Sequence, residues 1–355
     1  MRHVLIFLLL TMAVRCAQAQ WAIEESGTTA DLRGIDVVGG GVAWASGTHG
    51  TVLRTVDDGA HWQRCSTPDG ADGLDFRGVQ AFDAETAIVM SSGSGDLSRL
   101  YKTADGCRTW KLVFTNPDKD GFWDALLLHR YGKDGALLGD PVHGRFSLWE
   151  TQDKGETWTR SLAAGLEAHN GEGAFAASNS SLFLDEAFAT GFVTGGNAGA
   201  RLFFRKNLNF IARVLPLKSG SESTGGFSFD ARSRCCWVAV GGDYQKPNET
   251  NGTAAYTRDG GKSWLAAQTM PHGYRSSVAY DEAAKMWIAV GPNGTDVSAD
   301  DGKNWRALRP DAAHGDAADA DRNWNALSLP FVVGPKGRIG KLRAEAPAAG
   351  KESAQ

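Results

Sequence analysis

Short apolar runs alternate with polar turns along nearly the whole chain, and none of them indicates a helix longer than a turn or two. In the first such unit, runs over residues 35–38, 41–46 and 50–55 are followed by a fourth that begins at Trp62. Runs of this length between glycines and aspartates predict β-strands joined by tight turns. The pattern therefore predicts an all-β protein of seven such units. The other six begin near Phe76, Phe122, Glu172, Thr224, Tyr274 and Asn323.

The last unit contains only three predicted strands, over residues 326–329, 331–333 and 338–342. The segment 21–23 supplies a natural fourth strand, because pairing the two ends of the chain covers the strand edges that an open ring would expose. We therefore predict a single domain over residues 20–343. Its predicted fold is a seven-bladed β-propeller closed by pairing of the N-terminal strand with the last blade. We expect residues 344–355 to form a disordered tail.

A turn motif, Thr/Ser-x-Asp-x-Gly-x-x-Trp, recurs about every 40–50 residues, which is the period of a propeller blade. The aspartate can accept backbone N–H bonds across the turn, the glycine takes a positive φ, and the hydroxyl adds a second local bond. The tryptophan gives the next strand a large apolar surface, so we expect the motif to be structural. A degenerate copy ends at Phe210 and keeps no aspartate. The full copies begin at Thr55, Thr151, Thr257 and Ser298, and a fifth, at Thr103, has its glycine one place early.

The motif is the signature of the Asp-box, or BNR-repeat, β-propellers. The unit from Trp44 to Trp62 (Trp-Ala-Ser-Gly-Thr-His-Gly and onward) resembles the repeat of the photosystem II stability/assembly factor family, and looser copies cover nearly the whole mature chain. This resemblance implies a seven-bladed propeller. Photosynthetic members of the family are assembly chaperones that dock on membrane-protein intermediates, partly through an arginine-bearing face. Nothing in the sequence indicates a photosynthetic host, so the resemblance implies a protein partner but not that particular role.

Residues 1–19 have the form of a secretory signal, with Arg2, an apolar run and the small-x-small site Ala17-Gln-Ala19. We therefore predict a periplasmic or extracellular protein, with no transmembrane segment in the mature chain. Loss of Arg2 and Arg15 takes the formal net charge from −4 to −6. This mild acidity argues against nucleic acid as a partner. We expect a monomer.

The cysteines do not suggest zinc, since no Cys-x-x-Cys spacing occurs. Cys65 and Cys107 lie at equivalent ends of neighbouring repeats, and in an exported protein they could be bonded or free; both alternatives stand at this point. For the adjacent pair Cys235-Cys236 we favour a strand residue and its neighbour over a redox device, because a vicinal disulfide is strained.

Candidate site residues come from the start of each innermost strand, which faces the central channel. Aligning these starts places three arginines and two acids around the channel mouth, together with a glycine and an asparagine, although Trp123 competes with Asp124 for its position. The aligned residues are Arg33, Arg77, Asp124, Glu172, Gly225, Arg275 and Asn325. Neighbouring turns add Asp140, His143 and Arg145, and further polar residues are His169, Asn170, Asp243, Tyr244 and Lys246.

Two interpretations of this ring remain open. Arginines bind carboxylates bidentately, so the ring could form a pocket for an anionic or carboxylate-bearing ligand. Alternatively, the charges could pair with one another and plug the channel. Our predicted binding set is Arg33, Arg77, Asp124, Asp140, His143, Arg145, Glu172 and Arg275.

Two function classes follow. The first is a non-enzymatic propeller that binds a protein partner or an anionic ligand at the channel mouth, in the manner of an assembly or stability factor. The second is a glycoside hydrolase of sialidase type, with Arg33, Arg77 and Arg275 as an arginine triad and Asp124 and Glu172 as the carboxylates. The sialidase Arg-Ile-Pro motif is absent, and no tyrosine occupies an inner-strand position beside a suitable glutamate. We predict no catalytic residue, no metal site and no cofactor.

Overall fold

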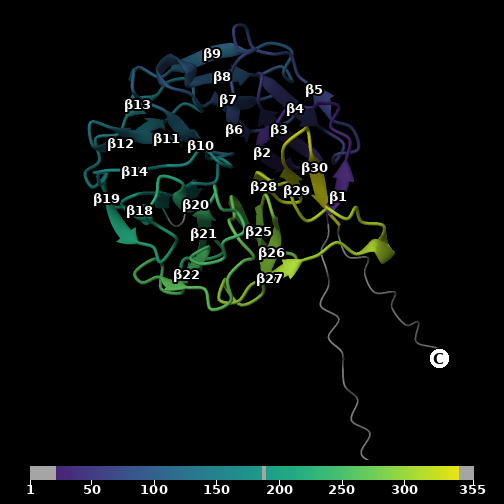
Figure 1. The fold of residues 1–355 in the computed structure, drawn as a ribbon. Helices are drawn as coiled ribbons and strands as arrows, with labels where there is room; N and C mark the ends of the chain where they lie inside the picture. Colours follow the sequence, from purple (N-terminus) through teal and green to yellow (C-terminus); the bar gives the residue numbers. More distant parts are fainter. Residues whose placement is uncertain (1–20, 186–188, 344–355) are drawn as a thin grey trace, which may run out of the picture.

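The computed structural model describes residues 21–185 and 189–343, which form a ring of seven β-sheets around a central axis (Figure 1). The predicted signal (1–19) and tail (344–355) lie outside the described residues. The innermost strands of consecutive sheets contact one another around the whole ring. The predicted all-β, seven-bladed propeller is thus confirmed. In the described ranges, helical structure is limited to the 3-10 turns η1 (Gly95–Leu97) and η2 (Ala312–His314), and no helix is long and apolar enough to span a membrane.

Blades 1 to 3 have four antiparallel strands each, which run in order from the innermost outward. Blade 1 comprises β2 (Leu32–Gly39), β3 (Val42–Gly47), β4 (Thr51–Thr55) and β5 (Gln63–Arg64). Blade 2 comprises β6 (Phe76–Ala81), β7 (Ala87–Ser91), β8 (Arg99–Thr103) and β9 (Lys111–Thr115). Blade 3 comprises β10 (Trp123–Leu128), β11 (Gly135–Val142), β12 (Arg145–Thr151) and β13 (Thr159–Arg160).

The later blades follow the same order, and blade 5 carries two additional strands. Blade 4 comprises β15 (Leu182–Asp185), β16 (Ala189–Val193), β18 (Arg201–Lys206) and β19 (Asn209–Val214). Blade 5 comprises β20 (Thr224–Ala231), β21 (Trp237–Asp243), β22 (Ala254–Thr257) and β23 (Leu265–Ala266), extended on its inner side by β17 (Gly195–Gly196) and β14 (Glu172–Gly173). Blade 6 comprises β24 (Ser277–Asp281), β25 (Met286–Gly291), β26 (Gly294–Ser298) and β27 (Arg306–Leu308). Blade 7 comprises β28 (Ala326–Ser328), β29 (Phe331–Val333), β30 (Ile339–Leu342) and β1 (Trp21–Glu24).

The fourth unit differs from the sequence-based prediction. Glu172 does not begin the innermost strand of blade 4; that strand is β15, about ten residues later. Residues 172–173 instead pair with β17, which in turn pairs with β20 through Gly195 and Gly225. These glycines permit the close approach of β17 to β20, because a Cβ on Gly225 would lie 2.4 Å from the Cα of Gly195. The pairing of β14 with β17 thus places the segment after Glu172, residues 174–177, at the mouth of the channel.

The ring closes as predicted, by antiparallel pairing of β1 with β30. Figure 1 shows the two strands side by side in the last blade. Trp21 anchors the closing strand: it is 1% exposed, its indole N–H donates to the Thr295 hydroxyl at 3.1 Å, and its ring contacts Trp324. Closure therefore depends on burial of one large side chain as well as on the strand pairing.

Seven hydrophobic clusters fill the spaces between consecutive blades, each drawing residues from two neighbouring sheets. The motif tryptophans contribute to five of them, and Phe210 contributes to a sixth, so their predicted role in the core is confirmed. Side chains also cap the free edges of innermost strands across blade boundaries. Asp36 accepts the N–H of Ala81 at 2.7 Å, and Gln80 accepts that of Leu128 at 3.0 Å.

The recurring turn makes the hydrogen bonds that its residues predict. The Thr55 hydroxyl donates to Asp57 at 2.9 Å and accepts the N–H of Gly59 at 3.0 Å, while Asp57 accepts the N–H of His61. Hydrogen bonds, chiefly from the His61 side chain, lower the pKa of Asp57 to about 2. Gly59 has a φ of 88°, as the motif requires. The corresponding hydroxyl-to-aspartate bonds recur in the turns that begin at Thr103, Thr151, Thr257 and Ser298.

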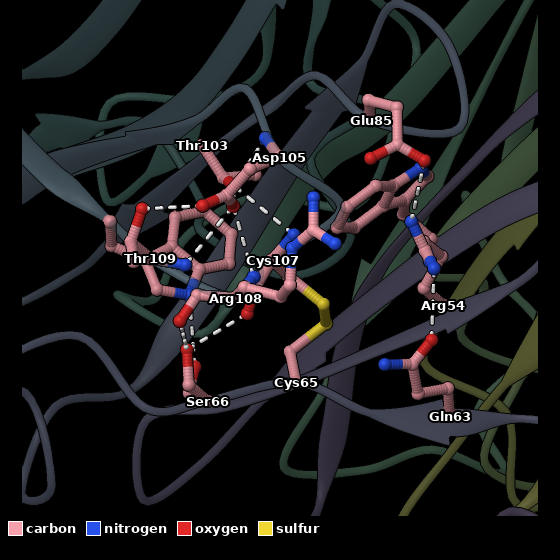
Figure 2. The surroundings of a disulfide bond; sticks show 12 residues. Arg54, Gln63, Cys65, Ser66, Glu85, Thr103, Asp105, Cys107, Arg108 and Thr109 are labelled. Atoms are coloured by element: carbon pink, nitrogen blue, oxygen red, sulfur yellow. Dashed lines mark hydrogen bonds and ion pairs between the residues drawn. A yellow bond between two sulfur atoms is a disulfide. The ribbon is translucent and has the colours of Figure 1, made fainter.

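A disulfide joins Cys65 to Cys107, with Cα atoms 5.3 Å apart, which decides between the two alternatives left by the sequence (Figure 2). It connects blades 1 and 2. Cys107 has a φ of 63° and holds the position that glycine takes in the other turns. Cys235 and Cys236 are free thiols directly before β21, so neither is the strand residue that the sequence suggested, and no disulfide joins them.

We predict that replacing Cys65 and Cys107 together by alanine lowers the free energy of unfolding by about 2–4 kcal/mol, because the bridge closes a loop with a sequence separation of 42 residues. Urea unfolding measures this loss. Cys235→Ser is the matched control and should leave the midpoint unchanged. Equal stability of the double variant and the wild type would contradict the prediction.

We predict that Trp21→Ala lowers the free energy of unfolding by about 3–5 kcal/mol, the usual cost of removing a buried aromatic side chain. Ile23 lies in the same strand but is 42% exposed, so Ile23→Ala should cost far less. Thermal or urea unfolding of the two variants compares them directly. Similar losses in both would show that strand pairing alone, without the Trp21 anchor, closes the ring.

Candidate functional site: the channel-mouth cavity

The innermost strands of four blades break register at the same point near their start. In β2 the pairing shifts between Leu32 and Gly34, which leaves Arg33 as the extra residue of a β-bulge. A bulge re-aims the side chain of its extra residue. The residue that follows must be small in this strand, because a Cβ on Gly34 would lie 2.7 Å from the Ser46 hydroxyl. The equivalent extra residues of β6, β10 and β20 are Arg77, Asp124 and Phe227.

All four bulge residues line one cavity of about 520 Å³, which we call the central cavity. Its wall is formed by residues at or just before the innermost strands and by the segment 174–177, which follows β14. Such a volume is in the range of small-molecule and peptide side-chain sites. The other lining residues used below are Asp140, Phe175, Tyr244, Tyr274, Ser276, Trp324 and Asn325.

Arg33 and Arg77 share a single counter-ion. The Nε of Arg77 donates to Asp75 Oδ2 at 2.8 Å, and its Nη1 donates to the Ala176 carbonyl at 3.1 Å. The Nε of Arg33 is 3.9 Å from Asp75 Oδ1 and has no hydrogen-bond partner. Within the described ranges, the Arg33 guanidinium makes no hydrogen bond at all. Two cations against one carboxylate leave this side of the cavity positive.

Asp124 faces them as a buried acid. The residue is 1% exposed and its Oδ2 has no hydrogen-bond partner. Burial, followed by repulsion from Asp140, raises the pKa of Asp124 well above its usual value, while Arg77 acts in the opposite direction. Burial also raises the pKa of Asp140, whose Oδ1 accepts the N–H of Ala174 at 2.9 Å. A protonated Asp124 would be a hydrogen-bond donor to whatever enters the cavity.

Aromatic side chains form another part of the wall. Phe175 stacks on Phe227 with ring centroids 3.9 Å apart, and Tyr274 meets Phe227 edge-on at 4.7 Å. Tyr244, which is 46% exposed, contacts both phenylalanines at the rim. Burial raises the pKa of Tyr274, so its hydroxyl stays protonated. The cavity thus combines available guanidinium donors with an apolar surface, a combination that suits a carboxylate next to an apolar group.

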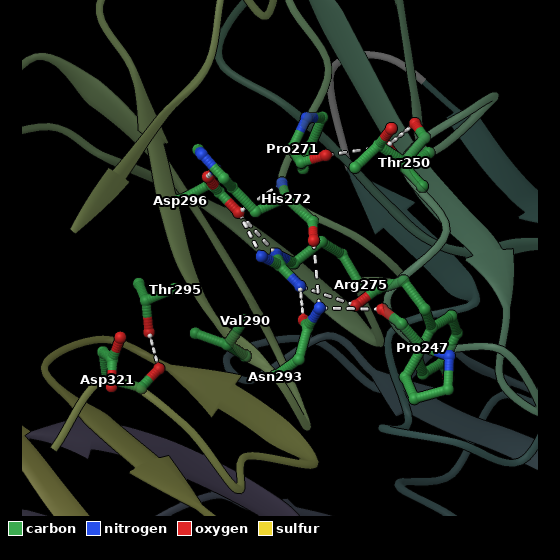
Figure 3. Close-up of polar contacts among 12 residues, drawn as sticks. Pro247, Thr250, Pro271, His272, Arg275, Val290, Asn293, Thr295, Asp296 and Asp321 are labelled. Atoms are coloured by element: carbon green, nitrogen blue, oxygen red, sulfur yellow. Dashed lines mark hydrogen bonds and ion pairs between the residues drawn. The ribbon is translucent and has the colours of Figure 1, made fainter. Parts of the chain in front are cut away.

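Arg275 does not reach the cavity. It is fully buried, its Nε donates to Asp296 at 2.8 Å and its Nη1 donates to Asn293 at 2.5 Å, as Figure 3 shows. Asp296 also contacts the His272 ring at 2.7 Å. Because residue 277 opposes Val290, Ser276 is the residue equivalent to Arg33, and the predicted alignment was wrong by one position in blade 6.

Glu172 is also engaged internally. One of its oxygens accepts from Arg201 Nε at 2.8 Å and from the Thr194 hydroxyl at 2.5 Å. The other pairs with Arg201 Nη2 and accepts the N–H of His169. The Glu172 side chain is fully buried, and this ion pair holds β14 against the start of β18. The predicted position of Glu172 at the start of an innermost strand was wrong, because residues 174–181 lie between Glu172–Gly173 and the innermost strand β15.

The remaining predicted residues lie outside the central cavity. His143 is exposed in the turn between β11 and β12, with a φ of 53°. Arg145 pairs with Glu167 at 3.3 Å and donates to the Ala163 carbonyl. Of the eight predicted binding residues, the structure therefore brings Arg33, Arg77, Asp124 and Asp140 together in the cavity.

Sequence reasoning missed Phe227, Ser276 and the aromatic wall. A usable signal was present in the first three blades, where an apolar residue, a charged residue and a small residue follow one another: Leu32-Arg33-Gly34, Phe76-Arg77-Gly78 and Trp123-Asp124-Ala125. In blade 5 the bulge residue is apolar, so a search for charged residues could not find it. Phe175 reaches the cavity from the segment 174–177 and has no repeat position at all.

The site offers little for glycoside hydrolysis. Both oxygens of Glu172 are bound by Arg201 and its neighbours, and Glu172 does not line the central cavity that contains Asp124. Arg275, the third arginine of the supposed triad, is paired with Asp296.

Solved structures with a similar fold include two of YCF48 and one of a WD40 propeller. A structure of YCF48 bound to D1 peptide matches with a TM-score of 0.63 and 14% identity, over 92% of this chain and 97% of that one. YCF48 from Cyanidioschyzon merolae matches with a TM-score of 0.61 and 17% identity, over 91% and 99%. The WD40 propeller domain of Doa1 matches with a TM-score of 0.59 and 12% identity, over 92% and 97%.

No protein-family model and no curated protein matches the sequence. At the identities found, the structural likenesses establish the architecture only. The chain is a β-propeller similar in fold to YCF48 over more than nine-tenths of its length.

Proposed function

We propose that this chain is an exported, non-enzymatic propeller that binds a protein partner at the central cavity by holding a carboxylate of that partner, as an assembly or stability factor would. The observation that carries the proposal is the state of Arg33. Its guanidinium lines the cavity, and within the described residues it makes no hydrogen bond and has only a distant, shared counter-ion. A guanidinium in this state is available for a bidentate bond to a carboxylate.

Three further features support a carboxylate as the bound group. Arg77 adds a second positive charge on the same side of the cavity. Burial raises the pKa of Asp124, and the protonated form of Asp124 can donate a hydrogen bond to the carboxylate. The stacked Phe175 and Phe227 offer an apolar surface next to these groups.

A peptide segment suits the cavity as the source of this carboxylate. YCF48, which is similar in fold, has been solved with a D1 peptide bound, so this architecture can hold a peptide. The cavity of about 520 Å³ admits one or two side chains and a chain end, not a folded domain. The partner would therefore insert a segment, with additional contacts on the rim.

We predict that Arg33→Gln weakens binding of a carboxylate-bearing peptide by roughly tenfold to a hundredfold, the usual effect of losing a hydrogen bond to a charged group. Isothermal titration with a short peptide ending in a free carboxylate measures the change. Arg213→Gln is the matched control, because Arg213 is exposed on β19 and donates only to the adjacent Ala212 carbonyl. Equal affinity of Arg33→Gln and the wild type would exclude the cavity arginine as the anchor.

We predict that the affinity falls as the pH rises above the usual titration range of an aspartate, about 4. The pKa of Asp124 is raised, so the protonated, hydrogen-bond-donating form persists above the usual range of an aspartate and is lost as the pH rises through that raised pKa. The ionised form would repel the ligand. A loss of about fivefold to tenfold is expected in the wild type.

Asp124→Asn removes this titration, so its affinity for the same peptide should be almost independent of pH above that range. Asp72→Asn, a change in an exposed loop, should retain the wild-type profile. A wild-type profile that is flat, or one that Asp124→Asn leaves unaltered, would rule out Asp124 as the pH-dependent donor.

A further inference from the structure

An acidic groove adjoins the central cavity. It has a volume of about 840 Å³ and shares Asp140, Ala174, Phe175 and Tyr244 with the cavity. Its charged lining consists of Asp120, Asp140, Glu172 and Glu222, with His169 as an additional titratable group and no lysine or arginine. The cavity and the groove are therefore neighbours that share part of their walls and differ in electrostatic character.

The groove carries uncompensated negative charge. Glu172 is neutralised by Arg201. Asp120 and Glu222 are exposed, and neither forms an ion pair with any part of the chain that the structure describes. No cation lies between them in the lining of the groove. A cationic group placed there would meet carboxylates without having to displace an internal partner.

The central cavity has the opposite character and points independently to a ligand. Arg33 and Arg77 are its cations. Asp124, which is only 1% exposed, also lines this cavity, and its buried Oδ2 has no hydrogen-bond partner. Such an orphaned polar atom is costly unless a bound group satisfies it.

The wall between the cavity and the groove is rigidly attached. The backbone of the segment 174–176 is held at one end by the bond from Ala174 to Asp140, and at the other by the bond from Arg77 to the Ala176 carbonyl. The Glu172–Arg201 pair anchors the chain just before this segment. A ligand that crosses this wall therefore meets a preorganised surface, which reduces the entropic cost of binding.

We infer that the ligand is the C-terminal end of a polypeptide with lysine or arginine side chains shortly before its free α-carboxylate. This inference rests on the proposed function and specifies the partner of the same site. The α-carboxylate binds Arg33 and Arg77, and the last side chain packs on Phe175 and Phe227. The preceding residues follow the groove, where their cationic side chains face Asp120, Asp140 and Glu222. A chain end fits a cavity with a groove beside it better than an internal loop, which needs room for two strands of chain.

The test uses three fluorescently labelled peptides and fluorescence anisotropy with the mature protein. The first peptide has two lysines before a C-terminal phenylalanine with a free carboxylate. The second is its C-terminal amide, and the third has both lysines replaced by glutamine. We expect the amide to bind at least about tenfold more weakly than the first peptide. The glutamine peptide should bind about fivefold more weakly, with a difference that shrinks as salt is added.

A protein variant assigns the lysine effect to the groove. Asp120→Asn combined with Glu222→Gln should bind the lysine and glutamine peptides with nearly equal affinity, because the groove has lost its exposed charges. Asp72→Asn, which changes an exposed carboxylate outside the groove, should keep the preference for the lysine peptide. The glutamine peptide should bind the groove variant and the wild type equally, which shows that the variant is folded.

The outcomes separate the two proposals. Binding that needs the free carboxylate but ignores the lysines, or a lysine preference that survives in the groove variant, would overturn the inference and leave the proposed function standing. Binding that does not depend on the free carboxylate would overturn the proposed function itself. Equal loss of both peptides in the groove variant would also overturn the inference, since the acids would then support the fold of the site rather than the cationic side chains.

Discussion

The register break near the start of the innermost strands is the feature on which the candidate site depends. A regular strand would direct successive side chains alternately into the two neighbouring interblade clusters, where a charged group would have to be paired. The bulges in β2, β6, β10 and β20 add one residue each and turn its side chain toward the axis. The same irregularity in four sheets therefore converts the centre of a packed ring into a lined cavity.

The charges of the mouth divide into those that hold the fold together and those that remain available. The Arg275–Asp296 and Arg201–Glu172 ion pairs are buried. The first stabilises the segment before β24 against β26 in blade 6, and the second holds β14 in place. Arg77 uses part of its guanidinium internally, since its Nη1 donates to the Ala176 carbonyl. Of the two arginines that line the cavity, Arg33 has fewer contacts with the described residues than Arg77. The paired charges have the arrangement expected of a plug, and the pocket interpretation remains a proposal that rests on Arg33 and Arg77.

The repeat pattern made most of the fold predictable. Alternating short runs and the recurring turn located the blades, and the missing strand of the last unit indicated closure by residues 21–24. Local chemistry explains this success, because the hydrogen bonds of the turn at Thr55 join residues at most four positions apart. The site was less predictable, since it depends on where each strand breaks register and on an insertion that breaks the repeat. Residues 174–181 separate Glu172 from the innermost strand β15, and the carboxylate that pairs with Arg275 lies 21 residues away along the chain.

A photo-crosslinking measurement tests most directly whether the cavity holds the chain end of a partner. Benzoylphenylalanine is placed at Phe227 inside the cavity or at Leu208, which is 81% exposed on the outer edge, and each protein is irradiated in an extract of the source cells. Mass spectrometry then identifies the crosslinked peptides. We expect C-terminal peptides of a partner at position 227 that are absent at position 208 and absent when Arg33 is also changed to glutamine. Crosslinks at position 227 to internal segments without a free carboxylate, or the same crosslinks at both positions, would contradict this account.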